Sequence, residues 1–241
     1  MQWSLVGSEM CIRDSNQFNV EYRGAFAPEN NIFDDCIIKK IFSFLNISPP
    51  NISFSITKNF PYQAGLGSAS SNAATVIKIL ENLEIINKKN IFDYTDLGSD
   101  IPFFLNQHDS LVRGRGDLIS NIVFPKYFFL ITKPHFNCST KKMYDTFIPS
   151  DFDYNVEEDI EEINDNDNGH DFEKVIKKLE PDFISMYNKM DNLEDTIFTR
   201  LTGSGSCIFS VFENKLSAEN AKNSFLKSYP NLWAAVAENN N

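Results

Sequence analysis

The sequence predicts an α+β fold of two domains, and two stretches carry this prediction. Residues 52–57 alternate apolar and polar side chains, as in a half-buried strand, and a glycine turn and a helical apolar spacing at 73–83 follow. Further on, a glycine loop at 203–206 leads into an apolar strand, a helix at 218–229 and a last strand at 232–236. Loop, strand, helix and strand in this order are typical of a ferredoxin-like domain. A chain of 241 residues, 42% of them hydrophobic, is long enough for one large or two modest domains.

The chain is acidic, with a formal net charge of −11. Such a surface repels nucleic-acid backbones and anionic membranes, so neither is expected as a general partner, although a nucleotide substrate needs only a local pocket. No apolar run is long enough to span a membrane. The cysteines contain no C-x-x-C pair, which indicates reduced thiols and a cytoplasmic protein rather than a disulfide framework or zinc site. They are Cys11, Cys36, Cys138 and Cys207.

The other elements of the amino-terminal half follow from periodicity and turn residues. Residues 18–23 predict a strand, and the apolar residues between Ile32 and Phe44 recur at helical spacing. Pro49 and Pro50 mark a turn before the next strand. The helix after the glycine turn is expected to end at 87–90, because amide and basic residues are typical of a helix C-terminus.

The carboxy-terminal half begins with an apolar run at 124–132 that predicts a strand. Ser139 and Thr140 precede a helix that they can cap. Apolar residues at 172–179 and at 183–190 have helical spacing, which indicates core helices rather than a binding site.

The acidic segment 151–173 contains a run of Asn and Asp that is similar to a calcium loop. With Gly169 at the sixth loop position, the twelfth position is Val175, where an EF-hand requires a bidentate Glu. We therefore expect a solvated loop here. The three histidines have no metal-binding spacing and are expected at the surface or in loops: His108, His135 and His170.

The glycine turn between the strand and the helix has the residues of a phosphate-binding loop. Glycines allow the backbone to approach an anion, and the free amides and dipole of the helix start favour negative charge. Ser70 and Ser71 could cap the helix, or bind phosphate or its magnesium ion through their hydroxyls. A strand-to-helix turn without a ligand can have the same composition, and this alternative stays open. The residues expected to bind phosphate are Pro61, Ala64, Gly65, Leu66, Gly67, Ser68, Ala69, Ser70 and Ser71.

The loop does not match the G-x-x-x-x-G-K-[ST] or G-x-G-x-x-G patterns, but it resembles another family. From Pro61 to Ala74 it reads P-x-x-x-G-L-G-S-x-S-S-N-A-A, which is similar to the second motif of the GHMP kinases, such as galactokinase, homoserine kinase and mevalonate kinase. Residues 97–104, L-G-S-D-I-P-F-F, resemble the L-G-[AS]-D-[VI]-P-F-F segment of the kinases that act on 4-diphosphocytidyl-2-C-methyl-D-erythritol. Residues 201–209 resemble the third glycine motif of those kinases.

The resemblance runs from about Phe18 to about Ala237 and implies both a fold and a reaction. It implies a GHMP kinase N-terminal, ATP-binding domain with a ribosomal protein S5 domain 2-like fold at 16–123, then a ferredoxin-like C-terminal domain at 124–241, with the site between them. It also implies transfer of the ATP γ-phosphoryl group, with Mg²⁺, to the 2-hydroxyl of 4-diphosphocytidyl-2-C-methyl-D-erythritol. This is a step of the non-mevalonate (MEP) isoprenoid pathway in bacteria.

Asp100 is the catalytic residue that the resemblance implies, and its chemistry fits. A kinase needs a carboxylate that orients the attacking hydroxyl or accepts its proton. The apolar neighbours of Asp100 predict that it lies in a partly dry wall, although an Asp at a helix start can also have a purely structural role. The resemblance places a substrate-side loop at Gly203, Ser204 and Gly205. It also relates the turn at 114–117 to a substrate-side turn of the family.

Residues 1–15 match nothing in these kinases, and we interpret them as a non-native leader. The family begins with a strand that brings a Lys and an Asn to the site, and this strand is not found here, so the amino-terminal domain is expected to be incomplete. Two alternatives stay open. The chain could be another small-alcohol kinase of the superfamily, or a non-catalytic nucleotide-binding fragment.

Overall fold

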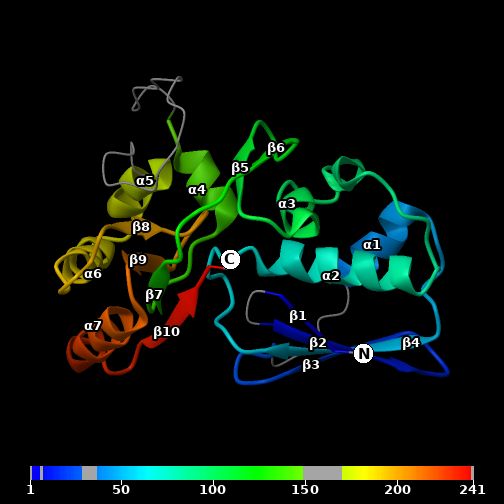
Figure 1. Cartoon of the computed structure of the whole chain (residues 1–241), viewed down its shortest axis with the longest axis horizontal. Helices are drawn as coiled ribbons and strands as arrows, with labels where there is room; N and C mark the ends of the chain where they lie inside the picture. Colours follow the sequence, from blue (N-terminus) through cyan, green and yellow to red (C-terminus); the bar gives the residue numbers. More distant parts are fainter. Residues whose placement is uncertain (1, 6–7, 29–36, 149–169, 240–241) are drawn as a thin grey trace. The chain divides into compact units, whose positions relative to one another are not determined.

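The structure is a computed structural model that describes residues 2–5, 8–28, 37–148 and 170–239 (Figure 1). It divides into two compact units. Unit 1 contains residues 1–62 and 67–123, and unit 2 contains residues 63–66 and 124–241. Each unit has a four-stranded sheet with helices, which confirms the α+β class. The chain passes between units after Val123, at the expected domain boundary, but residues 63–66 of the glycine turn are grouped with unit 2.

The sheet of unit 1 has the strand order β1-β2-β4-β3. Strand β4 forms where the apolar and polar residues alternate, and it pairs with β2 antiparallel and with β3 parallel. The strands are β1 Gln2–Leu5, β2 Ser8–Asp14, β3 Asn19–Arg23 and β4 Ile52–Lys58. A separate hairpin consists of β5 Ser110–Arg113 and β6 Leu118–Asn121.

The segment that we interpreted as a leader contributes strands β1 and β2 to this sheet. Strand β2 pairs with β4 from Ser8 opposite Lys58 to Asp14 opposite Ile52. Met10 has 2% of its surface exposed and belongs to the core of the unit. Strand β2 is therefore the neighbour of β4 in the sheet, and its apolar residues contribute to the core.

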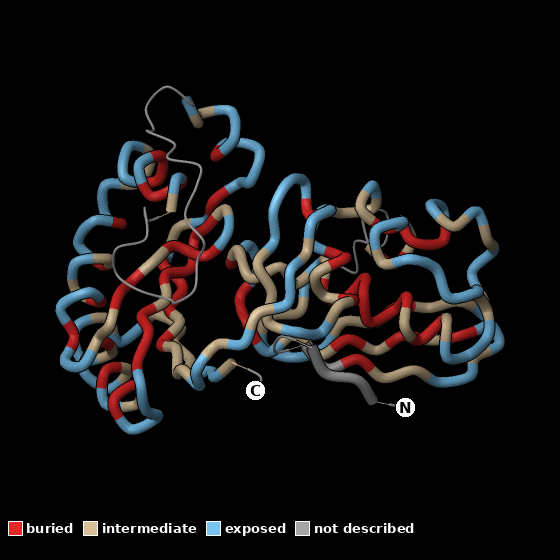
Figure 2. Tube along the Cα trace, turned by 45° about the horizontal axis from the view of Figure 1, so that its top comes forward, coloured by how far each residue is buried: buried red, intermediate tan, exposed pale blue. Residues whose placement is uncertain are grey.

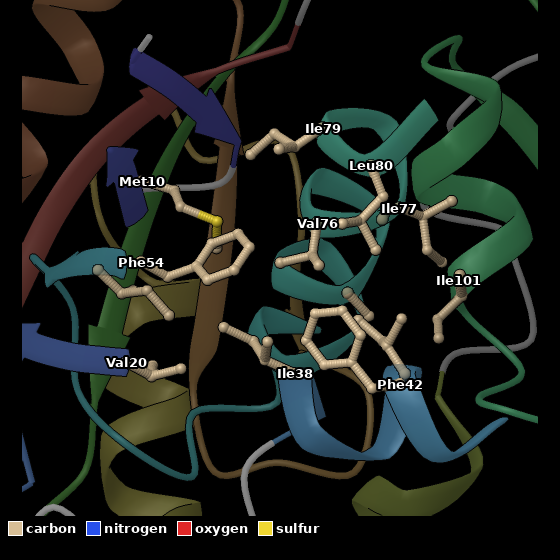
Figure 3. Packing of buried hydrophobic residues seen from close by; sticks show 14 of the residues in the cluster. Met10, Val20, Ile38, Phe42, Phe54, Val76, Ile77, Ile79, Leu80 and Ile101 are labelled. Atoms are coloured by element: carbon tan, nitrogen blue, oxygen red, sulfur yellow. The ribbon is translucent and has the colours of Figure 1, made fainter. Parts of the chain in front are cut away.

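Helices α1 and α2 of unit 1 pack against one face of the sheet, and α3 packs against α2. Figure 3 shows Val20 and Phe54 of the strands facing Ile38 and Phe42 of α1 and Val76 of α2. This packing follows from the sequence, because the even positions of β4 and the helical apolar positions all point to one interior. The helices are α1 Ile37–Leu45, α2 Ser68–Asn82, the 3-10 helix η2 Ile91–Tyr94 and α3 Ile101–Asn106.

The sheet of unit 2 has the strand order β10-β7-β9-β8, and all of its pairs are antiparallel. Counted along the unit this is the order 4-1-3-2, with helices after the first and third strands. This confirms the ferredoxin-like arrangement. The strands are β7 Phe128–Lys133, β8 Thr199–Leu201, β9 Ile208–Phe212 and β10 Trp233–Glu238.

The helices of unit 2 bury the apolar stripes that the sequence predicts. Phe183, Met186 and Met190 have at most 2% of their surface exposed, and they join Val175 and Ile176 in one core. Strands β7, β8 and β9 contain buried residues, whereas β10 contains none, and the helices alternate between buried and exposed residues (Figure 2). The helices are α4 Thr140–Thr146, α5 Asp171–Leu179, α6 Asp182–Asp191 and α7 Lys215–Ser228.

Several expected boundaries were wrong. Helix α2 begins at Ser68 and ends at Asn82, earlier than expected, and Asn90 instead caps η2 by accepting from the amide of Phe92. Strand β7 starts four residues later than expected, and β8 was missed because three residues are too short for an alternating pattern. The expected calcium-like run at 164–169 and the helix start at 32–36 lie outside the described residues.

Candidate functional site

The glycine turn enters α2 at Gly67, which is the N-cap residue and has φ 65° in the left-handed region. No side chain caps the helix there, and the amide of Ser71 makes the first helical hydrogen bond, 2.9 Å to the carbonyl of Gly67. The amides of residues 68–70 therefore have no partner within the helix. Together with the positive end of the helix dipole, they form a suitable site for a phosphate.

Ser70 and Ser71 do not cap the helix as expected, because both lie within its first turn. Ser71 has 1% of its surface exposed and is part of the buried side of α2. Ser70 is partly exposed. Of the two hydroxyls considered for phosphate or magnesium binding, that of Ser70 is the accessible one.

The start of α3 lies next to the start of α2, within unit 1. A Cβ on Gly67 would lie 2.8 Å from the ring of Phe104, and a Cβ on Gly98 would lie 3.8 Å from the hydroxyl oxygen of Ser70. The segment that carries Asp100 therefore packs beside the free amides of α2. The tertiary structure thus brings together two of the three motifs that the sequence identifies.

Asp100 is the N-cap residue of α3, but its side chain makes no capping hydrogen bond. Its Oδ1 atom accepts a hydrogen bond of 3.3 Å from the hydroxyl of Ser99. The carboxylate is exposed, so the expected dry wall was wrong: the apolar neighbours Ile101 and Pro102 turn inward and leave Asp100 at the surface. An exposed carboxylate with one oxygen bound to a neighbouring hydroxyl is accessible to a substrate hydroxyl.

The tip of the β5–β6 hairpin packs against Ser99. Gly116 has φ 89°, and a Cβ on it would overlap the carbonyl oxygen of Ser99. The carboxylate of Asp117 accepts a hydrogen bond of 2.8 Å from the amide of Arg115 and closes the turn. The turn at 114–117 therefore packs against Ser99, the residue next to Asp100. The sequence did not indicate this contact.

In unit 2, residues 63–66 of the glycine turn are joined to the third glycine motif. The amides of Ser206 and Cys207 donate to the carbonyls of Gln63 and Ala64, at 3.4 and 3.2 Å. A Cβ on Gly65 would overlap the carbonyl of Thr202 and lie 2.8 Å from that of Gly205. The glycine at position 65 is thus required by packing within unit 2.

The loop at 203–206 is also held from its other side. Ser204 and Thr140 share a hydrogen bond of 2.7 Å between their hydroxyls. Ser206 donates to the carbonyl of Phe136 at 2.9 Å. Ser139 rather than Thr140 caps α4, by accepting from the amide of Lys142, so the hydroxyl of Thr140 contacts the loop instead.

Lys133 is a buried cation that sequence reasoning missed, and it shares the carbonyl of Phe136 with Ser206 of this loop. Its Nζ atom donates to three oxygens, the carbonyls of Pro134 and Phe136 and the side chain of Asn137. Burial lowers its pKa. Burial also raises the pKa of Cys138 to about 11 and that of Cys207 to about 12, so both thiols stay protonated and are poor nucleophiles at neutral pH.

A cavity of about 380 Å³ in unit 2 contains none of the expected site residues; His135, Asp182, Ser185 and Tyr229 contribute to its lining. Within the part of the chain that the structure describes, no three His, Cys, Asp or Glu side chains are grouped to hold a metal ion. Among those residues, no helix combines the length and apolarity that crossing a membrane requires.

Comparisons with known proteins show the family of the chain. The family models described as GHMP kinases N terminal domain and GHMP kinases C terminal match residues 35–106 and 153–231. The chain is 29% identical to the 4-diphosphocytidyl-2-C-methyl-D-erythritol kinase of Thermodesulfovibrio yellowstonii over 95% of its own length and 84% of that protein. It is 30% identical to the enzyme of the same name from Fervidobacterium nodosum over 74% of its own length and 69% of that protein.

The fold is also similar to a solved structure. The crystal structure of 4-(cytidine 5'-diphospho)-2C-methyl-D-erythritol kinase superposes with a TM-score of 0.75 and 20% identity. The match covers 98% of this chain and 87% of that one.

Proposed function

Because the chain belongs to the GHMP kinase family, we propose that it transfers the γ-phosphoryl group of ATP to the 2-hydroxyl of 4-diphosphocytidyl-2-C-methyl-D-erythritol. The observation that carries this proposal is the packing of the Asp100 segment beside the uncapped start of α2, through Phe104 at Gly67 and Gly98 near Ser70. It puts a carboxylate and a phosphate-binding helix start in one unit. The names of the relatives support the choice of substrate.

In this proposal the amides of residues 68–70 bind the phosphates of ATP, and the helix dipole stabilises their charge. Asp100 orients the substrate hydroxyl, or accepts its proton, through the oxygen that Ser99 leaves free. The loop at Gly203, Ser204 and Gly205 contacts the substrate. Phosphoryl transfer depends mainly on positioning and charge stabilisation, so few side chains need to react.

Mg²⁺ fits this site as an ion bound together with ATP. Magnesium is usually held by one or two protein oxygens and the substrate phosphates rather than by a preformed cage. The partly exposed Ser70 is the hydroxyl that would contact it. When bound, the ion neutralises the charge that develops on the transferred group.

A phosphorylation assay tests the proposal. The purified chain is incubated with ATP, Mg²⁺ and either 4-diphosphocytidyl-2-C-methyl-D-erythritol, homoserine or mevalonate, and the products are measured by mass spectrometry. We expect ATP-dependent gain of one phosphoryl group by the cytidyl substrate only. Phosphorylation of another alcohol would favour a different kinase of the family, and nucleotide binding without any product would favour a non-catalytic protein.

The compartment that we propose is the cytoplasm. Cys11, Cys138 and Cys207 are unpaired thiols, which are typical of a reducing compartment.

A further inference from the structure

Residues 63–66 have an unusual pattern of hydrogen bonds to unit 2. The consecutive carbonyls of Gln63 and Ala64 both accept from the third glycine motif, from the amides of Ser206 and Cys207. The carbonyl of Ala64 accepts a further bond of 2.8 Å from the hydroxyl of Thr202. In a regular strand, consecutive carbonyls point to opposite sides, so this segment is not a simple added strand.

The direction of these carbonyls fixes the direction of the amides that follow them. A trans peptide is planar, and its N–H points opposite to its C=O. The amides of Ala64 and Gly65 must therefore both point away from the third glycine motif, on the same side of the segment. Gln63 and Gly65 have φ values of 52° and 70°, the positive values that such a turn needs. Successive amides on one side of a turn form an anion-binding concavity.

The side chain of Thr202 takes part in this arrangement. It is buried, with 9% of its surface exposed, and its hydroxyl lies 2.8 Å from the oxygen of Ala64 and 3.2 Å from that of Cys207. A hydroxyl has a single hydrogen and can donate fully to one of these two oxygens. The shorter distance favours the oxygen of Ala64 as the acceptor. The carbonyl oxygen of Thr202 accepts a hydrogen bond of 2.7 Å from the amide of Gly205, which closes the turn at residues 202–205.

We propose that Thr202 is a positioning residue for ATP: its hydroxyl fixes the Ala64–Gly65 peptide so that the Gly65 amide is presented to a phosphate oxygen. The proposal rests on the proposed function, because it assumes that the anion is a phosphate of ATP. It adds a role for a residue outside the phosphate-binding loop itself. Thr202 contacts no substrate and acts through the backbone of Ala64.

Three variants test it. Thr202→Val keeps the shape of the side chain and removes the hydroxyl, and Thr202→Ser restores the hydroxyl. Thr199→Val is the matched control, because Thr199 is also buried in unit 2 and its hydroxyl pairs with that of Ser210 at 2.8 Å, away from residues 63–66. Binding of a non-hydrolysable ATP analogue and of adenosine is measured by calorimetry. Deuterium uptake at the amides of residues 205–208 is measured without nucleotide.

Loss of one hydrogen bond should weaken binding of the ATP analogue about threefold to tenfold in Thr202→Val. Adenosine, which has no phosphate, should bind all three variants like the wild type. Deuterium uptake at the Ser206 and Cys207 amides should rise in Thr202→Val, and Thr202→Ser should restore both properties. Thr199→Val should change neither.

Unchanged analogue affinity in Thr202→Val, or an equal loss in Thr199→Val, would overturn the positioning role. Failure of Thr202→Ser to restore affinity would do the same. A wild type that binds no ATP analogue would instead contradict the proposed function. In that case the deuterium uptake still decides whether Thr202 holds residues 63–66.

Discussion

The carbonyl oxygen of Gly65 lies 2.9 Å from the position that a Cβ of Gly203 would take. These two glycines are 138 residues apart in the chain and belong to different motifs, yet each is required by the backbone of the other segment. A Cβ on Gly65 would in turn overlap the carbonyl of Thr202, next to Gly203. The second and third glycine motifs are therefore packed backbone to backbone within unit 2, and this contact explains why both contain glycine.

Gly65→Ala should accordingly destabilise the protein as well as weaken nucleotide binding. The new Cβ meets backbone atoms that cannot move aside, and φ 70° adds strain, so we expect a loss of about 1–3 kcal/mol in the free energy of unfolding. Gly98→Ala is the control, because the atoms nearest to its Cβ belong to flexible side chains, that of Ile101 at 3.2 Å and that of Ser70 at 3.8 Å. Denaturant unfolding of both variants is the measurement, and equal stability of the two would contradict the packing argument.

Gly67→Ala tests the start of α2. Its Cβ would lie 2.8 Å from the Phe104 ring, and its φ of 65° is unfavourable for any residue with a Cβ, by about 1–2 kcal/mol. The helix start should shift, and affinity for ATP should fall in calorimetry. In the double variant Gly67→Ala with Phe104→Leu, the ring contact is relieved but the backbone strain stays, so only part of the affinity should return. Full return would show that the ring alone requires glycine here.

Asp100→Asn tests the catalytic carboxylate. The amide keeps the size of the side chain and can still accept from Ser99, but it cannot take a proton, so turnover should fall by about two to four decades. Affinity for ATP should change little, because the phosphates are assigned to the amides of residues 68–70. Asp96→Asn, at another exposed Asp of the same unit, is the control and should keep wild-type turnover. More than about a tenth of wild-type turnover in Asp100→Asn would exclude a role in the chemical step.

Glu173 should make the stability of the protein depend on pH. It is buried and accepts 2.9 Å from the amide of Leu201, and burial raises its pKa above the usual 4.5. The folded state therefore binds the proton more tightly than the unfolded state. The contribution of this residue to stability is most favourable below pH 4.5 and decreases as the pH rises through the folded pKa.

The measurement is the difference in melting temperature between Glu173→Gln and the wild type from pH 4 to pH 7. The glutamine does not titrate, so the variant should gain relative to the wild type as the pH rises. Thr199→Val changes no titratable group, and its difference from the wild type should be constant over the same range. A constant difference for Glu173→Gln as well would show that burial does not disfavour its ionised form.

Met10→Ala tests whether the amino-terminal residues are structural. Met10 is a core residue of β2, so truncation should cost about 2–5 kcal/mol in the free energy of unfolding. Arg13→Ala, at an exposed position of the same strand, should change stability by less than about 0.5 kcal/mol. Equal effects of the two substitutions would contradict the burial of Met10 in the core of unit 1.

The sequence alone determined the α+β class, the main strands and helices, and the three motifs on which the proposed function rests. Alternation in β4 and helical spacing in α2 are local signals, because each residue's face depends only on its neighbours in the chain. The glycine turn was found in the same way, as a short string with defined chemistry, whereas Asp100 was singled out through the family resemblance. Resemblance to a family added their expected roles.

Only the tertiary structure decided which backbone atoms surround those strings. It left Asp100 exposed where apolar neighbours predicted burial, and it placed Ser70 and Ser71 in the first turn of α2 rather than at its cap. It paired Thr202 with Ala64, and it brought Ser206 and the buried Lys133 to the same carbonyl, that of Phe136. These relationships join residues that are remote in sequence or depend on the direction of individual carbonyls. No local pattern encodes them, because they are set by how the separate segments pack.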